Sequence, residues 1–182
     1  MNKIRFVSLL CMISILSVLL MGCGETVDSP IVGKWAYIHD KETAVLELKS
    51  NGSAVYNNEK YSFAEDGQYI TLSSGKDKQK LRYELVNDDL YLYEPATYIY
   101  ASEGEPDGLI GVWANENKWS YEFTKEGTFR EDGYFPGYYT VDEANSTIKL
   151  VYNDHFEDTT IYYSLDGNRL LVEYPWRMVR MN

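Results

Sequence analysis

Apolar and polar residues alternate along most of the chain after residue 30, in short runs separated by turn-forming residues. Alternation with a period of two places successive side chains on opposite faces of a strand, and no run there shows the spacing of an amphipathic helix. Asn51-Gly52 is typical of a tight hairpin, and further turns are predicted at 74–77 and 87–89. The expected strands of the first half are 34–38, 44–49, 53–63 with an irregularity at Asn57-Asn58, 69–72, 81–85, 90–93 and 98–100. The pattern predicts an all-β protein.

The same pattern occurs twice. Ile-Val-Gly-Lys-Trp at 31–35 matches Leu-Ile-Gly-Val-Trp at 109–113, and 46–52 matches 121–127. Later matches keep nearly the same offset, as insertions confined to turns would allow. The sequence therefore indicates a duplication, with one β repeat at 31–101, a polar linker at 102–108 and a second repeat at 109–182, whose last strands are predicted at 170–173 and 176–181.

The sequence allows two arrangements of these strands. If the first and last strands of each repeat pair, the strand at Trp35 lies beside 98–100, and each repeat forms a small antiparallel barrel without free edges. The expected fold is then a tandem pair of small meander or barrel-like domains that lean on each other. The alternative is one continuous many-stranded barrel or sheet.

The two Gly-x-Trp motifs carry a resemblance. Gly33-x-Trp35 and Gly111-x-Trp113 resemble the opening strand of bacterial lipocalin-like domains, which are short antiparallel meanders found on secreted lipoproteins, mostly of unknown function. In lipocalins the tryptophan plugs one end of the barrel, and an arginine from the closing strand stacks over it. The resemblance implies structural roles for both glycines and both tryptophans.

The resemblance also implies a stacking partner in each repeat. Arg177 or Arg180 is the expected partner of Trp113 in the second repeat. In the first repeat Thr97 and Tyr100 occupy the matching positions, so the arginine is missing there. What this resemblance implies concerns the fold more than the function.

The N-terminus reads as a secretion signal. Lys3 and Arg5 precede an apolar run at 6–20, which is shorter than the span of about 20 residues that a transmembrane helix needs. Leu20-Met21-Gly22-Cys23 then resembles the bacterial lipobox. We therefore expect residues 1–22 to be removed, and Cys23 to carry the lipid of an extracytoplasmic lipoprotein on the cell membrane. The tether, residues 23–30, would reach about 25 Å beyond Cys23.

Charge and cysteine content narrow the possible chemistry. The net charge is −11, and it becomes −13 when residues 1–22 are removed with two of the 17 positive charges. Nucleic-acid binding needs Lys and Arg against phosphates, so no nucleic-acid partner is expected. Cys11 and Cys23 are the two cysteines, and neither would remain as a free thiol. No cofactor or metal site is predicted.

Aromatic residues supply the candidate binding surface. Tyr134, Phe135, Tyr138 and Tyr139 cluster around Pro136-Gly137, which reads as a turn, so some of the rings should be exposed. Trp119 and Tyr121 on the preceding strand would extend this surface. The other interpretation is that the rings pack between the two repeats.

The function predicted from these residues is non-catalytic. The sequence carries neither a Gly-x-Ser-x-Gly nor a His-Glu-x-x-His motif, so no catalytic residue is named. A membrane-anchored module that binds an envelope glycan or protein through aromatic β surfaces is the first hypothesis. The alternatives are a lipocalin-like carrier of a small apolar ligand and an envelope hydrolase that uses an acidic pair.

Overall fold

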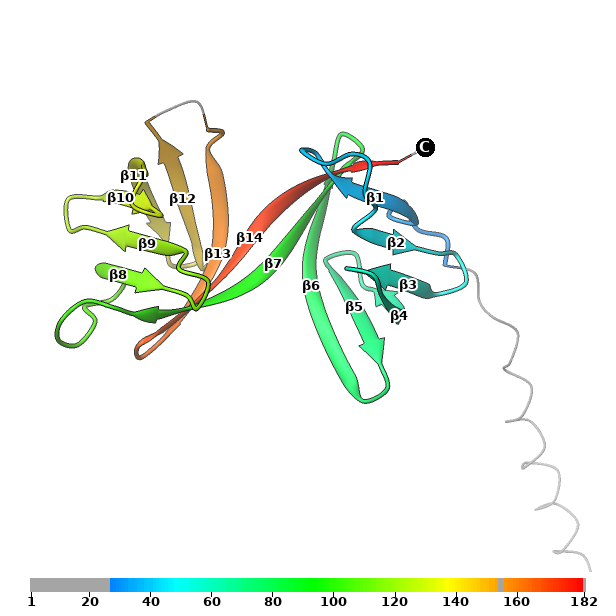
Figure 1. Cartoon of the computed structure of the whole chain (residues 1–182), viewed down its shortest axis with the longest axis horizontal. Helices are drawn as coiled ribbons and strands as arrows, with labels where there is room; N and C mark the ends of the chain where they lie inside the picture. Colours follow the sequence, from blue (N-terminus) through cyan, green and yellow to red (C-terminus); the bar gives the residue numbers. More distant parts are fainter. Residues whose placement is uncertain (1–26, 154–155, 182) are drawn as a thin grey trace, which may run out of the picture.

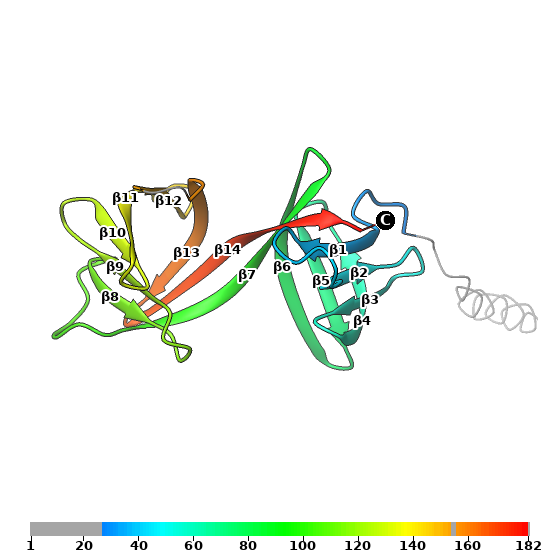
Figure 2. The same cartoon turned by 45° about the horizontal axis from the view of Figure 1, so that its top comes forward.

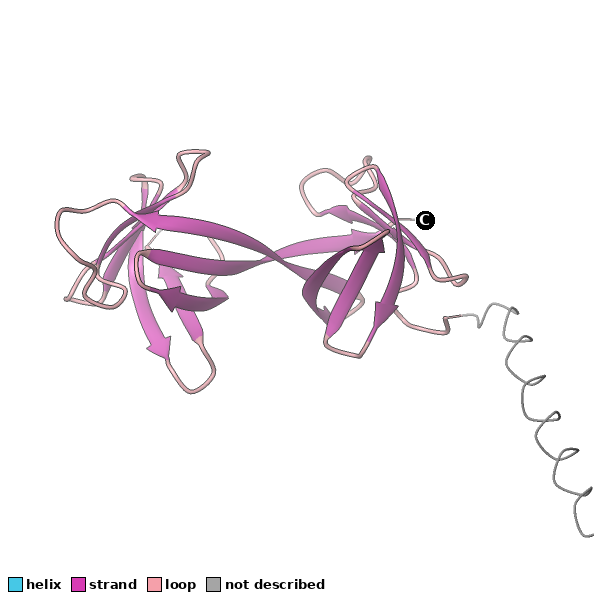
Figure 3. Ribbon diagram, turned by 90° about the horizontal axis from the view of Figure 1, so that it is seen from below, coloured by secondary structure: helices cyan, strands magenta, loops and turns pink. Residues whose placement is uncertain are grey.

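The computed structural model describes residues 27–153 and 156–181, and all regular structure in these ranges is β (Figure 3). Fourteen strands follow one another: β1 (Gly33–Tyr37), β2 (Leu46–Leu48), β3 (Ser53–Tyr56), β4 (Glu59–Glu65), β5 (Tyr69–Ser74), β6 (Asp77–Val86), β7 (Asp89–Tyr100), β8 (Gly111–Ala114), β9 (Ser120–Phe123), β10 (Thr128–Glu131), β11 (Phe135–Asp142), β12 (Thr147–Tyr152), β13 (Thr159–Asp166) and β14 (Arg169–Arg180). The all-β prediction is confirmed. Over the described ranges, no helix is long and apolar enough to cross a membrane.

The strands form one antiparallel sheet that closes into a ring. Each strand pairs with its neighbours in the chain, and β1 pairs with β14 to complete the circuit. An additional pairing of β14 with β7 joins opposite sides of the ring and divides it in two. As Figure 1 shows, this division produces two lobes: the first around β1–β6, and the second around β8–β13.

Two long strands belong to both lobes. β7 and β14 pair in ten steps, from Arg169–Ile99 to Met178–Leu90. β7 begins beside β6 in the first lobe and ends beside β8 in the second, while β14 runs from β13 to β1 in the opposite direction. Figure 2 shows these two strands as the connection between the lobes. We call them the crossing ribbon.

The expected closure of each repeat on itself is wrong. The strand at Trp35 does not lie beside 98–100: Trp35 pairs with Arg180, and Tyr100 pairs with Trp113. The strands predicted separately at 90–93 and 98–100 are one strand that runs through Pro95. Likewise 170–173 and 176–181 are joined through Pro175.

The crossing point explains why these prolines are tolerated. β7 pairs with β6 as far as Tyr93 and with β8 only from Ile99, so between them β14 is its one neighbour. β14 is similarly unpaired on its other side between Glu173 and Met178. Proline cannot donate a ladder hydrogen bond and is therefore accepted where a strand has a free edge. Pro95 and Pro175 both lie in these free stretches.

Each lobe has its own apolar core, and the crossing ribbon contributes to both. β7 places Leu90 and Leu92 in the first core and Tyr98 in the second. β14 places Leu170 and Val172 in the second core and Met178 in the first. Neither core is therefore built from one repeat alone.

The tryptophans of the two motifs occupy equivalent places. Trp35 and Trp113 are fully buried, and their indole N–H groups donate to the carbonyl oxygens of Ile31 and Leu109, both at 2.8 Å. Every buried donor and acceptor of a described side chain has a partner. Burying an indole with its N–H satisfied gains its full apolar area without a polar penalty.

The stacking partners are exchanged between the repeats. The Arg180 guanidinium lies 4.4 Å from the centre of the Trp35 ring, and so covers the tryptophan of the first lobe rather than Trp113. Tyr100 packs edge-on against Trp113, with ring centres 5.1 Å apart. The expectation that Arg177 or Arg180 stacks on Trp113 is therefore wrong. Arg177 forms an ion pair with Asp89 at 2.7 Å.

The two glycines make room for these partners. A Cβ at Gly33 would meet the Arg180 guanidinium, and one at Gly111 would meet the Tyr100 ring. Both glycines also have positive φ angles, 151° and 122°, which favour glycine. The glycine of each Gly-x-Trp motif is thus required for two reasons: its backbone conformation and the side chain that packs against it.

Two of the hairpin turns are formed by asparagine and aspartate, one where the sequence predicts a turn and one where it predicts only an irregular strand. Asn57 and Asn58 both have positive φ and form a two-residue turn between β3 and β4, which divides the strand predicted at 53–63. Asn87 and Asp88 make the same kind of turn between β6 and β7. Two successive residues with positive φ are typical of the type I′ hairpin, in which Asn and Asp are favoured.

Candidate functional site

Exposed aromatic side chains gather on the second lobe. Tyr134 is 82 % exposed, Tyr138 58 %, Phe156 54 % and Trp119 46 %. The other strongly exposed large apolar residues of the described ranges are aliphatic: Val86, Ile99 and Leu165. We call Trp119, Tyr134, Phe135, Tyr138 and Phe156 the aromatic rim.

The meander brings three residues of the aromatic rim to one end of the second lobe, while Tyr138 lies further along β11, opposite Thr128. Alternate connections of an antiparallel meander lie at the same end of the strands. Trp119 precedes β9, Tyr134 ends the turn between β10 and β11, and Phe156 follows β12, so all three belong to one end of the second lobe. Ser120 and Asp132 bind these connections together: the Ser120 N–H donates to the Asp132 carboxylate at 2.7 Å.

The rings continue inward to a carboxylate. Phe156 packs against Phe135 with ring centres 4.8 Å apart and against Tyr152 at 5.7 Å. The Tyr152 hydroxyl donates a short hydrogen bond to Glu131, and the Tyr121 hydroxyl donates to the same carboxylate at 3.2 Å. The aromatic rim thus leads through Tyr152 to Glu131.

Glu131 lies in an unfavourable place for a negative charge. Burial raises the pKa of its carboxyl group above the ordinary value, although the hydrogen bonds from Tyr152 and Tyr121 oppose the shift. Burial and the nearby carboxylate also raise the pKa of Tyr98 to about 12. Among the described residues, no lysine or arginine forms an ion pair with Glu131.

Replacing Glu131 with glutamine is therefore expected to stabilise the fold in a pH-dependent way. The pKa of the Glu131 carboxyl group is raised above its ordinary value of 4.5 in the folded state. Ionisation of Glu131 therefore does not lower the stability of the fold below pH 4.5, and it lowers the stability increasingly as the pH rises from 4.5 through the folded-state pKa. The gain in unfolding free energy over the unmodified protein should grow across this range in urea denaturation. Glu122→Gln, at an exposed carboxylate paired with Arg130, is the control, and an equal gain at every pH would contradict the prediction.

The structure places the predicted aromatic residues in different settings. Tyr121 is buried and stacks on Phe123, and Tyr139 packs into the second core, so neither is part of the exposed surface. Pro136-Gly137 is not a turn: both residues belong to β11, and the turn is at 132–134. Gly137 faces inward, where a Cβ would meet the Phe129 ring and the Val151 carbonyl. Tyr138 points outward from the same strand.

Two residues of this region were not predicted. Phe156 was missed because it lies among acidic residues rather than in a strand. Glu131 could have been found from alternation, since it shares its face of β10 with buried Phe129. A charged residue at an inward position of a strand is the signal that identifies it.

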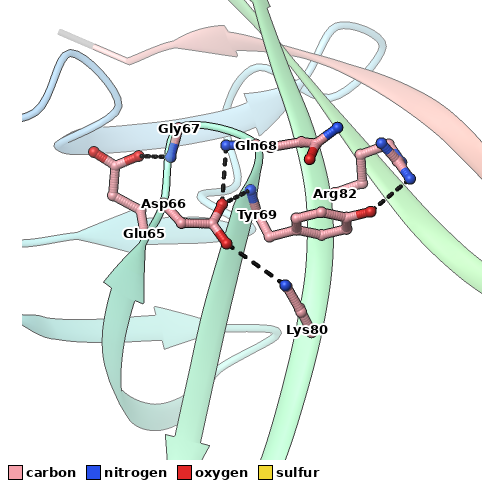
Figure 4. A network of polar contacts seen from close by, with 7 residues as sticks. All are labelled: Glu65, Asp66, Gly67, Gln68, Tyr69, Lys80 and Arg82. Atoms are coloured by element: carbon pink, nitrogen blue, oxygen red, sulfur yellow. Dashed lines mark hydrogen bonds and ion pairs between the residues drawn. The ribbon is translucent and has the colours of Figure 1, made fainter.

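A second polar cluster lies at the waist of the molecule. Figure 4 shows the turn between β4 and β5, where Asp66 accepts from the Tyr69 N–H at 2.7 Å and pairs with Lys80 at 3.5 Å. Arg82 donates to the Tyr69 hydroxyl at 2.6 Å. These contacts fix Tyr69 and Arg82 on the surface of the first lobe.

Arg82 joins the two lobes. Its guanidinium lies 3.8 Å from the centre of the Tyr162 ring, on β13, and 3.3 Å from Glu173 on β14. Hollows of about 250 Å³ and 600 Å³ flank this contact, and Arg82 and Tyr162 line both. Because its charge is already matched by Glu173, Arg82 acts as a brace between the lobes.

Comparison of the chain with models of protein families, with curated proteins and with solved structures finds no match. Over the described ranges, no group of three or more His, Cys, Asp or Glu residues is placed to hold a metal ion.

Proposed function

We propose that the protein is a lipid-anchored, extracytoplasmic lipoprotein whose aromatic rim binds an envelope glycan or protein without catalysis. Cys23, the proposed attachment site, lies outside the described residues. We further propose that the two lobes derive from a duplicated lipocalin-like unit. The equivalent burial of Trp35 and Trp113, each covered by a side chain of the crossing ribbon, supports that origin.

The observation that carries the proposed function is the uneven distribution of exposed rings. The exposed aromatic residues lie on the second lobe, whereas Asn57 and Asn58 form the corresponding turn of the first. Large exposed rings cost solubility and are enriched at interaction surfaces. Tyrosine and tryptophan also offer an apolar face with a polar group, which suits the faces and hydroxyls of sugars.

The position of the tether agrees with this assignment. Val27 already belongs to the first lobe, since its N–H donates to the Ser50 carbonyl at 2.6 Å and its side chain packs on the first core. Three residues separate Val27 from Cys23, so the distance that the tether can span from the lipid to the first lobe is about 14 Å rather than about 25 Å. The membrane would then lie on the side of the first lobe, and the aromatic rim is carried by the other lobe.

The other two hypotheses find less support. A carrier needs an internal cavity, whereas bulky side chains, including Trp35, Phe63, Trp113 and Phe123, are packed in the two cores. A glycosidase needs two carboxylates on either side of the bond that it cleaves. The groups hydrogen-bonded to the Glu131 carboxylate are tyrosine hydroxyls, and the nearby Asp132 carboxylate accepts from the Ser120 N–H instead.

The binding proposal is tested by truncating the aromatic rim. In the soluble form, residues 24–182, combined replacement of Tyr134, Phe135 and Tyr138 by alanine should weaken binding to purified cell envelopes by about tenfold or more, because aromatic anchors dominate such interfaces. Co-sedimentation with the envelopes measures the loss.

The control replaces exposed aliphatic residues elsewhere. Val86→Ala and Leu165→Ala remove apolar surface outside the rim and should leave binding unchanged. Circular dichroism would show that each variant keeps its β structure. Envelope binding that survives the triple replacement would remove the rim as the binding surface.

A further inference from the structure

The Glu131 carboxylate is a hydrogen-bond acceptor with unused capacity. An ionised carboxylate has about four acceptor positions, and the two hydroxyl donors named above occupy part of them. The side chain is only partly exposed, which makes its interaction with a cation stronger than in open water. The described residues supply no such cation.

The molecule shows elsewhere how it holds one. At the waist, the Arg82 guanidinium lies over the rings of Tyr162 and Tyr69 and is paired with Glu173. Two aromatic rings and a carboxylate thus enclose the cation. Cation–π contacts of this kind are favourable, and they become stronger when water is excluded.

A carboxylate and aromatic rings also lie together beside the aromatic rim, without a cation among the described residues. Glu131 supplies the carboxylate, and Tyr152 and Phe156 supply neighbouring rings. Among the described residues, the connections beside them add Glu116, Asp132, Glu157 and Asp158, the last paired with Lys149, against one lysine, Lys118. A negative potential of this kind attracts and retains positive ligands.

We infer that the aromatic rim binds an amino sugar of the cell envelope, with the protonated amine at Glu131 and the sugar faces on the exposed rings. This inference rests on the proposed function and names its ligand class. A sugar is favoured over a peptide because the rim combines flat exposed rings with the hydroxyl of Tyr134, which match the C–H faces and hydroxyl groups of a pyranose.

The first lobe contains a matched control. Glu94 accepts hydrogen bonds from the hydroxyls of Tyr37 and Tyr56, both at 2.7 Å, and so has two tyrosine donors, as Glu131 does. No strongly exposed aromatic ring accompanies it among the described residues of that lobe. Glu94→Gln and Glu131→Gln therefore make the same change with and without an aromatic rim.

The experiment is calorimetric titration of the 24–182 form with glucosamine trimer and with N-acetylglucosamine trimer, at a pH where the free amine is protonated. The glucosamine trimer should bind about tenfold or more tightly than the acetylated one, as expected for a partly buried charge pair. Glu131→Gln should remove this preference, whereas Glu94→Gln should keep it. Thermal unfolding confirms that both variants are folded.

Three outcomes would overturn the inference: no binding of the glucosamine trimer, equal affinity for the two trimers, or a preference that survives Glu131→Gln. Tighter binding of a lysine trimer than of the glucosamine trimer would assign the rim to a basic peptide instead. Each of these results leaves the broader proposal intact as long as the triple rim variant still loses envelope binding. If that variant binds envelopes normally, the proposed function itself fails.

Discussion

Replacement of Trp113 by alanine is expected to lower the free energy of unfolding by about 3–5 kcal/mol, the usual cost of removing a large aromatic side chain from a core. Trp113 is fully buried, packs against Tyr100 and donates a hydrogen bond to Leu109. The loss should affect both lobes, because β7 and β14 carry residues of both cores. Guanidinium denaturation followed by circular dichroism would measure it as a single transition.

Trp119→Ala provides the control with the same residue type. Trp119 is 46 % exposed, and its replacement should change the unfolding free energy by no more than about 0.5 kcal/mol. Two separate transitions in the Trp113→Ala variant, with the first lobe unaffected, would contradict the idea that the crossing ribbon couples the lobes.

Cutting the linker at 102–108 is expected to leave the two halves of the chain bound to each other. The first half ends in β7, and the second half ends in β14, and these strands pair over ten residue steps. Each half also covers the other's tryptophan, Arg180 on Trp35 and Tyr100 on Trp113. Separation would expose both cores and several strand edges at once.

A protease site placed in the linker makes this measurable. After cleavage, gel filtration under native conditions should give one species of unchanged size, and denaturing electrophoresis should give two bands. The intact protein carrying the same inserted site is the control. Two smaller native species would mean that each half closes on itself.

The local structure could be predicted from the sequence because it depends on local signals. Period-two alternation located most of the strands, and the turn predicted at 87–89 is present at Asn87-Asp88. The irregularity predicted at Asn57-Asn58 is a full turn between two strands. The strands at 90–100 and 170–181 were each predicted as two pieces for a local reason as well. A proline normally interrupts a strand. At Pro95 and Pro175 the strand continues because it has a free edge where β7 and β14 cross.

The pairing of β7 with β14 could not be predicted from any local sequence pattern. Residues 98–100 present the same alternation whether they pair with β1 or with β8, and the similar sequences around Trp35 and Trp113 make the two choices nearly equivalent. Register and alternation cannot decide between equivalent partners. The same limit applied to the candidate site, where adjacent tyrosines such as Tyr138 and Tyr139 point in opposite directions and only the observed pairing shows which is exposed.

The closure of β1 on β14 has a consequence for how the chain matures. Arg180 donates to the carbonyl oxygen of Val32, 148 positions earlier in the sequence. Contacts so distant form late, because the ends of a long loop must first be brought together. As the chain is made from its N-terminus, the first strand must wait for the fourteenth before its edge is covered. The beginning of the fold is thus the part completed last, and until then its open edge needs protection from other chains.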